Sequence, residues 1–318
     1  MISVIIASRD RSALLQETLD AISAQDPPGP PVEVIVVDNG SVDDTAEVVA
    51  AASRRMPFDV KYLYEGRPGK SHALNTAVTH ARGEIMVFTD DDVLPSPGWL
   101  AAFVRALDQT QADFATGRIL PRWEATPPRW LSPQMYGALS VADGGTARLR
   151  LAKDVNTQVT PMGGNLAVRR RVVERIGGWN PDLGSLKGTL RTGEDHEFAL
   201  EMFDAGFVGV YEPEACVSHR VPAERMRVGY FVRWLTTNGA IHATLEERYP
   251  TTSHYLLSVP RYLWRLIARD LADGVIGVVS LNARRALAGY MRMLWFAAYL
   301  RGRWQLRAQR HGAAAVPQ

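Results

Sequence analysis

The sequence predicts an α/β fold, in which helices flank a mostly parallel sheet and a helical extension follows at the C-terminus. Two observations predict it. In the N-terminal part, short runs rich in Val and Ile alternate with amphipathic helical patterns. From residue 230 onward the pattern is helical. The chain has 318 residues, 46% hydrophobic and 22% charged, which is ordinary for a globular protein.

Strands and helices alternate along the first ninety-odd residues. The apolar run "ISVIIA" at 2–7 is typical of a buried strand. A helix is expected at 12–25, with Ser12 as its N-cap. The alternation continues with strands at 32–38, 59–65 and 84–93 and helices at 43–55 and 70–82. Strands joined by helices form right-handed βαβ units, so these four strands are expected to be parallel.

The periodicity is weaker between residues 112 and 220. We expect strands at 112–120 and 208–220, a strand running into a short helix at 163–178, and a helix at 193–207 with Gly206 as its C-cap. We predict one domain over residues 1–222 and a basic helical region over 223–318. The last eight residues, "HGAAAVPQ", are expected to be disordered.

Charge is distributed unevenly along the chain. Residues 220–318 hold 15 Arg, no Lys and 5 acids, for a net +10, while residues 1–219 hold 21 basic and 29 acidic residues, for a net −8. The basic region is therefore expected to meet an anionic partner. Cys216 is the single cysteine, which excludes an intramolecular disulfide. The N-terminus resembles a strand rather than a signal peptide, and a cytoplasmic location is expected.

Three adjacent aspartates, Asp90 to Asp92, end the strand at 84–93. A solvated turn is one explanation. However, ligands of parallel sheets bind beyond the carboxyl ends of the strands. Other polar residues follow the first and second strands, at 8–10 and 38–40. Oxygen-rich sites suit Mg²⁺ or Mn²⁺, which commonly bridge to phosphate. The sequence therefore favours a metal–diphosphate site at this edge.

Five segments together resemble the inverting family 2 glycosyltransferases, which have the GT-A fold. They are "SVIIASRDR", "VEVIVVDNGSVDDT", "GKSHALNTAVTHARGEIMVFTDDDV", "GGNLAVRRRVVERIGGWN" and "GEDHEFALEMFDAGF". The resemblance covers about residues 1–220. It implies a nucleotide-binding, Rossmann-like sheet and an enzyme that moves a sugar from a nucleotide-sugar donor, with a UDP-sugar favoured, to a hydroxyl acceptor. A glycan, a lipid-linked glycan and a small molecule all remain open as acceptors.

The resemblance also implies where the donor and the divalent cation bind. Base and ribose contacts fall on Ala7, Ser8, Arg9 and Asp38. The D-x-D motif falls on Asp90 and Asp92, and the strand period of two turns this pair to one side and Asp91 to the other. Asp92 is the expected direct ligand of Mn²⁺ or Mg²⁺, and Asp90 faces ribose or a metal-bound water. Asp91 is either a donor contact or structural. His219 is either a third ligand or structural, and the neighbouring Arg220 is an alternative phosphate contact.

Glu194 and Asp195 lie at the start of the helix at 193–207. Complementarity to the helix dipole would explain acids there without chemistry. The resemblance implies instead that Asp195 is the catalytic base, since an inverting transfer needs one carboxylate to take the acceptor proton. Glu194 would then contact the acceptor or support Asp195.

Further site residues follow from the same resemblance. Lys70 in "GRPGKS" is either a nucleotide contact or a solvated lysine. A Walker motif would need glycine at position 64, where this chain has Tyr64, so a phosphate loop of that kind is excluded. The acceptor and sugar pocket is expected to include Gly163 and Gly164, for which a tight turn is the alternative, and Trp179, which either stacks on a sugar or belongs to the core. Lys187 and Arg191 flank a Gly-rich loop that is assigned to the same pocket and could order over the diphosphate.

The basic helical region allows several interpretations. Arg261, Arg265 and Arg269 recur every four residues on one helix face. We favour amphipathic helices on an anionic membrane surface, as in a peripheral protein of the inner face of the plasma membrane. Packing on the catalytic domain and a homodimer interface are the alternatives, and no nucleic acid is expected. For the whole chain, a non-catalytic nucleotide-sugar-binding scaffold and a sugar-nucleotide pyrophosphorylase are the competing functions.

Overall fold

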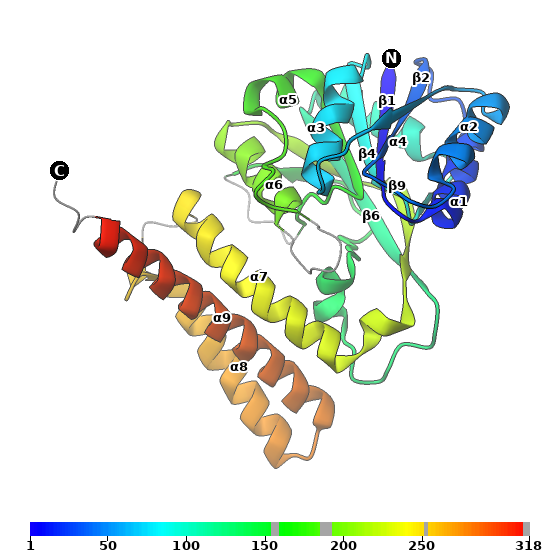
Figure 1. Cartoon of the computed structure of the whole chain (residues 1–318). Helices are drawn as coiled ribbons and strands as arrows, with labels where there is room; N and C mark the ends of the chain where they lie inside the picture. Colours follow the sequence, from blue (N-terminus) through cyan, green and yellow to red (C-terminus); the bar gives the residue numbers. More distant parts are fainter. Residues whose placement is uncertain (154–158, 185–192, 251–253, 314–318) are drawn as a thin grey trace. The chain divides into compact units, whose positions relative to one another are not determined.

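The structure is a computed structural model and describes residues 1–153, 159–184, 193–250 and 254–313 (Figure 1). These residues divide into two compact units. The first holds the described residues of 1–122, 140–189 and 194–220, and the second those of 123–139, 190–193 and 221–318. The predicted boundary at residue 222 stays a prediction, because the second unit also includes residues 123–139.

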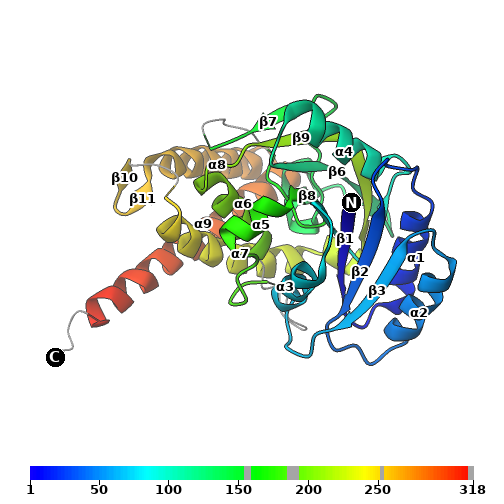
Figure 2. The same ribbon diagram turned by 90° about the horizontal axis from the view of Figure 1, so that it is seen from above.

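The first unit begins with four parallel strands, as the sequence predicts. They are β1 (Ile2–Ser8), β2 (Val32–Asp38), β3 (Asp59–Tyr64) and β4 (Ile85–Asp90), in the order β3-β2-β1-β4. The helices between them are α1 (Ser12–Ser23), α2 (Thr45–Arg55) and α3 (Lys70–His80) (Figure 2). The register pairs Ser8 with Asp38 and Ala7 with Asp90, so the carboxyl ends of β1, β2 and β4 meet at one edge.

The sheet continues beyond β4 with antiparallel strands, so it is mixed. These are β8 (Asn165–Arg169), β6 (Phe114–Trp123), β9 (Gly209–Val221) and β5 (Val93–Pro95), in that order, with β7 (Leu149–Leu151) pairing with β9. The helices of this half are α4 (Trp99–Thr110), α5 (Arg170–Ile176) and α6 (Glu194–Asp204), whereas the 3-10 helix η1 (Pro133–Leu139) belongs to the second unit. As predicted, Gly206 has a positive φ of 84° just after α6.

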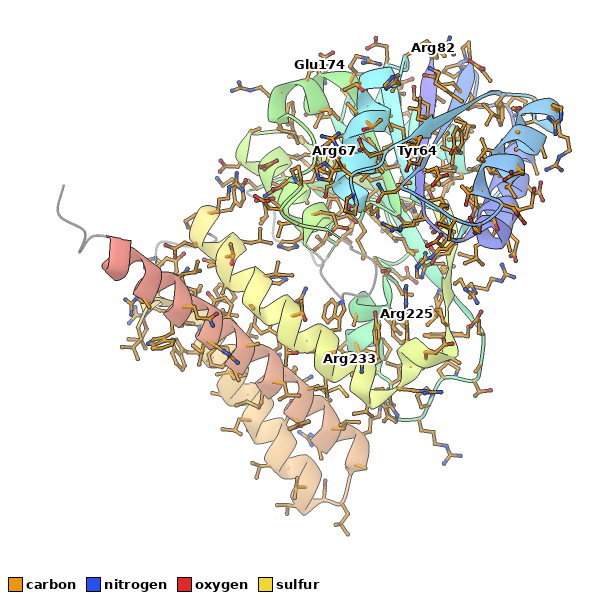
Figure 3. All side chains as sticks on the ribbon, in the orientation of Figure 1. Tyr64, Arg67, Arg82, Glu174, Arg225 and Arg233 are labelled. Carbon is orange, nitrogen blue, oxygen red and sulfur yellow. The ribbon has the colours of Figure 1, made fainter. Side chains whose placement is uncertain are left out.

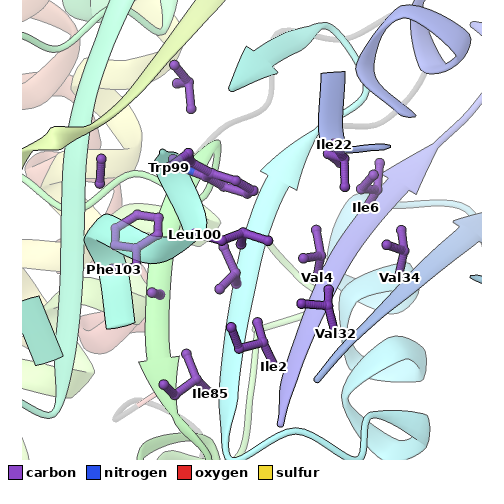
Figure 4. Close-up of a cluster of buried hydrophobic side chains, with 14 of the residues drawn as sticks. Ile2, Val4, Ile6, Ile22, Val32, Val34, Ile85, Trp99, Leu100 and Phe103 are labelled. Carbon is purple, nitrogen blue, oxygen red and sulfur yellow. The ribbon is translucent and has the colours of Figure 1, made fainter. Parts of the chain in front are cut away.

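Both faces of the sheet are buried, which explains why its first strands are apolar at nearly every position. Alternate residues of β1 enter different cores, with Ile6 in one and Ile5 in the other. The first core includes residues of α1, α2 and α4, among them Trp99 and Phe103 (Figure 4). The second includes residues of α3, α5 and α6.

A buried asparagine joins the antiparallel half to α4. The Asn165 amide Nδ2 donates to the carbonyl oxygens of Arg118 (2.9 Å) and Ala215 (2.8 Å), and its Oδ1 accepts from Trp99 Nε1 at 2.7 Å. A Cβ on Gly117 would overlap the Ala215 carbonyl, so the backbone of β6 approaches β9 more closely there than a side chain allows. One side chain thus fixes three elements around the start of β8.

The second unit contains three long helices, as the basic helical pattern predicts. They are α7 (Val228–Arg248), α8 (Arg261–Val279) and α9 (Ala283–Ala313), and both α7 and α8 pack on α9 (Figures 1 and 2). The unit also holds η2 (Ala223–Met226) and the short hairpin of β10 (Tyr255–Leu256) and β11 (Val259–Pro260). Within the described ranges, no helix is both long and apolar enough to cross a membrane.

Two local predictions were wrong. Ser12 is not the N-cap of α1, because Arg11 takes that position and no side chain caps the helix. The Ser12 backbone N–H is satisfied instead by Asp43 Oδ2 at 2.8 Å. The C-terminal residues 311–313, expected to be disordered, belong to α9, and the remaining five residues lie outside the described part of the chain.

Candidate functional site

The three consecutive aspartates do not follow the predicted strand geometry. Strand β4 ends at Asp90, Asp91 and Asp92 form a turn, and β5 begins at Val93. The prediction that a strand period aligns Asp90 with Asp92 was therefore wrong, because the turn removes that period. Asp90 Oδ1 lies 2.6 Å from Lys70 Nζ, whereas Asp91 and Asp92 share Arg11.

Arg11 ties the turn to the end of β1. Its Nη1 lies 2.9 Å from Asp91 Oδ1 and 3.1 Å from Asp92 Oδ2, and the Ser8 hydroxyl donates to Asp91 Oδ2 at 2.8 Å. Burial raises the pKa of Asp91 to about 6, although Arg11 opposes this. Asp91 and Ser8 are thus engaged with each other, and the geometry favours a structural Asp91. We did not predict Arg11 from the sequence, where its position after β1 was the only signal.

Lys70 links Asp90 to Asp195. Its Nζ lies 3.8 Å from Asp195 Oδ2 as well as 2.6 Å from Asp90 Oδ1. Both predicted glycines face these acids: a Cβ on Gly164 would lie 2.9 Å from Asp90 Oδ2, and one on Gly163 would overlap Asp195 Oδ1. That Asp195 oxygen is buried and, within the described part of the chain, has no hydrogen-bond partner. The glycines therefore leave space that these carboxylates occupy.

The electrostatics of this cluster are set by burial and by charge pairing. Burial lowers the pKa of Lys70, but Asp195 and Asp90 outweigh it and raise this pKa well above its ordinary value. Burial would raise the pKa of Asp90, yet Lys70 holds it below the usual range. Glu194, 6% exposed, has a pKa raised to about 7 by burial and by the Asp195 charge, with Lys70 opposing. Lys70 therefore stays charged between two acids while Glu194 holds a proton into the neutral range.

The loop before α3 places Lys70. The Asn39 amide donates to the carbonyl oxygens of Glu65 (2.9 Å) and Arg67 (2.7 Å), and its Oδ1 accepts from the Gly69 N–H at 2.8 Å. Gly69, with φ of 129°, adopts a conformation that other residues rarely take. Glu65 also pairs with the Arg67 guanidinium at 2.7 Å. Arg67 is labelled in Figure 3. Asn39, in the segment after β2, thus fixes the entry to α3.

The predicted donor residues lie at the same strand edge. Asp38 is buried, and its oxygens accept from the Ser41 N–H at 2.7 Å and the Tyr62 hydroxyl at 2.8 Å. Burial and the hydrogen bond to Asp38 raise the pKa of Tyr62 to about 12. Ala7 pairs in register with Asp90, and Arg9 Nε lies 3.9 Å from Asp10 Oδ2. The sheet register brings these residues near the aspartate turn, and their contacts with a donor stay a prediction.

Asp92 and His219 provide two possible metal ligands. Asp92 Oδ1 lies 3.5 Å from His219 Nε2, and both residues are buried. Two ligand atoms of one ion with bonds of about 2.1 Å lie roughly 3.0 to 3.6 Å apart, so this carboxylate–imidazole pair fits a divalent cation. Asp90 does not join them, because it pairs with Lys70. Within the described residues no group of three or more His, Cys, Asp or Glu side chains has metal-holding geometry, so the predicted three-ligand set is not assembled.

Trp179 was expected either to stack on a sugar or to belong to the core, and the structure places it in the core. It is 2% exposed, stacks on Phe198 at 4.1 Å between ring centroids and contacts Phe88 at 4.5 Å. Its ring is therefore part of the hydrophobic core. Lys187 and Arg191, predicted for the same pocket, lie outside the described residues. Arg220 donates its backbone N–H to the Asp92 carbonyl at 3.1 Å, which places it beside the turn.

Comparisons with known proteins agree with this fold. A sequence model described as "Glycosyl transferase family 2" matches residues 3–177. The chain belongs to glycosyltransferase family 2. Among relatives of this family 2 glycosyltransferase, the succinoglycan biosynthesis protein ExoM of Rhizobium meliloti is 27% identical over 234 residues, covering 73% of this chain and 71% of that protein. Glycosyltransferase AglE of Haloferax volcanii is 29% identical over 214 residues, covering 65% and 62%.

Solved structures similar to this family 2 enzyme have the GT-A-type fold. The mannosyltransferase PcManGT of Pyrobaculum calidifontis, in complex with GDP-Man and Mn²⁺, superposes with a TM-score of 0.65 at 24% identity over 96% of this chain and 87% of that one. TarS 1–349 of S. aureus, in complex with UDP-GlcNAc, gives 0.54 at 17% identity over 97% and 92%. These likenesses confirm the predicted fold class.

Proposed function

We propose that the chain is a metal-dependent, inverting glycosyltransferase in which Asp195 is the catalytic base. The observation that carries this proposal is the Asp90–Lys70–Asp195 cluster at the carboxyl edge of the parallel strands. Asp195 is half-buried, with one oxygen held near Lys70 and the other facing Gly163. Its buried Oδ1, which has no hydrogen-bond partner among the described residues, keeps its lone pairs for an incoming proton.

In the proposed reaction the acceptor oxygen attacks the anomeric carbon of the donor sugar. The bond from that carbon to the diphosphate oxygen breaks, the nucleoside diphosphate leaves with the electron pair, and Asp195 takes the acceptor proton. One carboxylate is sufficient, because attack opposite the leaving group inverts the configuration in a single step. Glu194 is only 6% exposed, so its proposed role is to support Asp195 rather than to contact the acceptor.

Asp92 and His219 are the residues that would hold the divalent cation, and Arg11 orients Asp92 through its ion pair. Bound Mn²⁺ or Mg²⁺ supplies Lewis-acid stabilisation of the leaving diphosphate. Neighbours of this fold bind GDP-Man or UDP-GlcNAc. We therefore propose a nucleoside diphosphate sugar as donor, with a UDP-sugar as our first candidate, and a hydroxyl-bearing acceptor.

The test is to separate binding from turnover in two variants. Asp195→Asn should retain binding of UDP or GDP with Mn²⁺ by calorimetry, and its donor hydrolysis or transfer should fall by roughly 10²- to 10⁴-fold. Asp92→Ala should lose the Mn²⁺-dependent part of binding. Asp182→Asn, an exposed aspartate, is the matched control and should behave as the parent. Undiminished turnover in Asp195→Asn would refute the base assignment, and binding without turnover in the parent would favour a scaffold.

A further inference from the structure

The outward face of α8 is basic in its first half and apolar in its second half. The inner face packs on α9, with Leu263, Asp270 and Gly277 buried, and a Cβ on Gly277 would overlap the backbone of Ala286. On the opposite side, the first half of α8 carries exposed Arg261, Arg265 and Arg269. The second half of the same helix exposes aliphatic side chains instead. A basic surface thus runs directly into an apolar one.

Five exposed aliphatic residues form what we call the tip patch, at the end of α8 and the turn into α9. They are Leu271 (52% exposed), Val275 (54%), Val278 (66%), Val279 (79%) and Leu281 (92%). Spacings of four, seven and eight residues from Leu271 place the four helical members on one stripe. Single exposed aliphatics are ordinary, but a contiguous group marks an interaction surface.

The helices α8 and α9, which the tip patch joins, carry a surplus of arginine. Residues 261–308 hold nine Arg, no Lys and two Asp, a net of 9 − 2 = +7. Both acids are engaged by arginines: Asp270 Oδ1 lies 3.0 Å from Arg292 Nε, and Asp273 Oδ1 lies 2.5 Å from Arg285 Nη2. Arg303 is paired with Glu247, but Arg269 before the patch and Arg284 just after it are both exposed.

We propose that the tip patch inserts into the boundary between headgroups and acyl chains of an anionic bilayer, while the surrounding arginines bind lipid phosphates. Interfacial helices bury such a face about 5–10 Å deep, and each nearby basic residue strengthens binding to anionic lipid. A second copy of the chain fits this surface less well. A two-fold contact through the patch would set one arginine-rich surface against another, and like charges across an interface oppose association.

The test is flotation of the full chain with vesicles of phosphatidylcholine, with and without roughly 30% phosphatidylglycerol. We expect recovery with the anionic vesicles only, decreasing with salt. Val275→Asp with Val279→Asp should lower the partition coefficient at least about tenfold, since it places two anions in the inserted face. Val42→Asp is the matched control, because Val42 is 91% exposed in the other unit, and it should float as the parent does.

Two further measurements make the result decisive. Circular dichroism should show equal helix content in all variants, because the mutated side chains are exposed. Analytical ultracentrifugation should show the same oligomeric state for parent and double variant. The proposal is overturned if the double variant floats like Val42→Asp, if neutral vesicles bind equally well, or if the double variant changes only self-association. Because the readout is lipid binding, the outcome is independent of the proposed sugar transfer.

Discussion

Glu194 holds a proton over a wider pH range than an exposed glutamate does. Burial and the adjacent Asp195 charge raise the pKa of Glu194 to about 7, whereas a glutamate in an unfolded chain titrates near 4.3. Between these values the folded state binds more protons than the unfolded state. By linkage, the free energy of unfolding then decreases as pH rises through this window. The carboxyl of Glu194 thus stabilises the fold below about pH 4 and costs stability above neutrality.

Replacing Glu194 by Gln should remove this pH dependence. Relative to the parent, Glu194→Gln should gain stability progressively from about pH 4.3 to pH 7 and no more beyond, because the amide does not ionise. Urea unfolding of both proteins at pH 5 and pH 8 measures the difference. A constant difference at the two pH values would contradict the assignment, and Glu174→Gln, at an exposed glutamate of α5, is the control for the change from Glu to Gln itself.

The sequence indicated candidate site residues, but it did not indicate which side chains those residues contact. The pattern of acids after apolar strands pointed to Asp90 and Asp92, whereas Asp195, at the start of α6, was indicated only by the family resemblance. It missed that the chain turns at Asp91, because a strand and a tight turn are equally compatible with three aspartates. Arg11 and the pairing of Lys70 with two carboxylates were also missed, since both depend on segments brought together only by the sheet. The choice between core and sugar contact for Trp179 could not be made from the sequence, because burial is a tertiary property.

Among the elements, β8 depends on one polar residue. Asn165 satisfies two carbonyl groups and one indole N–H in a buried position. Asn165→Leu would leave these groups without partners, and each orphaned buried group costs about 1–3 kcal/mol. We expect destabilisation on the order of 3 kcal/mol, measurable as a lower unfolding midpoint in calorimetry.

A matched control exists in the helical unit. Asn238 Oδ1 accepts from the Trp295 indole at 2.9 Å and is half-buried. Asn238→Leu removes the same type of bond but only one, so it should cost about 1 kcal/mol in its own unit. Equal losses for the two variants would argue against the special role of Asn165.

The parallel half of the sheet was predictable from the alternation of strands and helices alone. Strands β5 to β9 were predictable only in part, because antiparallel pairing leaves no regular βαβ spacing.

At the scale of the whole molecule, the second unit is not a simple C-terminal appendage. The segment 123–139 belongs to it although almost a hundred residues separate that segment from α7. Trp130 contacts Phe231 with ring centroids 5.4 Å apart, and the Tyr230 hydroxyl donates to the Ala138 carbonyl at 2.9 Å. We predicted a boundary at residue 222 because the charge and the hydrophobic periodicity of the sequence change there. A contact between segments far apart in the sequence changes neither the local charge nor the local periodicity, so the sequence gives no sign of it.

Removing the Phe231 ring should release the segment 123–139 without unfolding the α/β unit. Phe231 is 1% exposed, and a buried Phe→Ala change typically costs about 3–5 kcal/mol. We expect Phe231→Ala in the full chain to accelerate trypsin cleavage after the exposed Arg129, mapped by mass spectrometry of the fragments. Phe296→Ala is the control: Phe296 is 5% exposed in the cluster of α7, α8 and α9, and its loss should leave cleavage at Arg129 near the parental rate. Equal acceleration by both variants would mean that the segment responds to general loosening of the helices rather than to loss of the Phe231 ring. That result would contradict the claim that Phe231 holds residues 123–139 in the second unit.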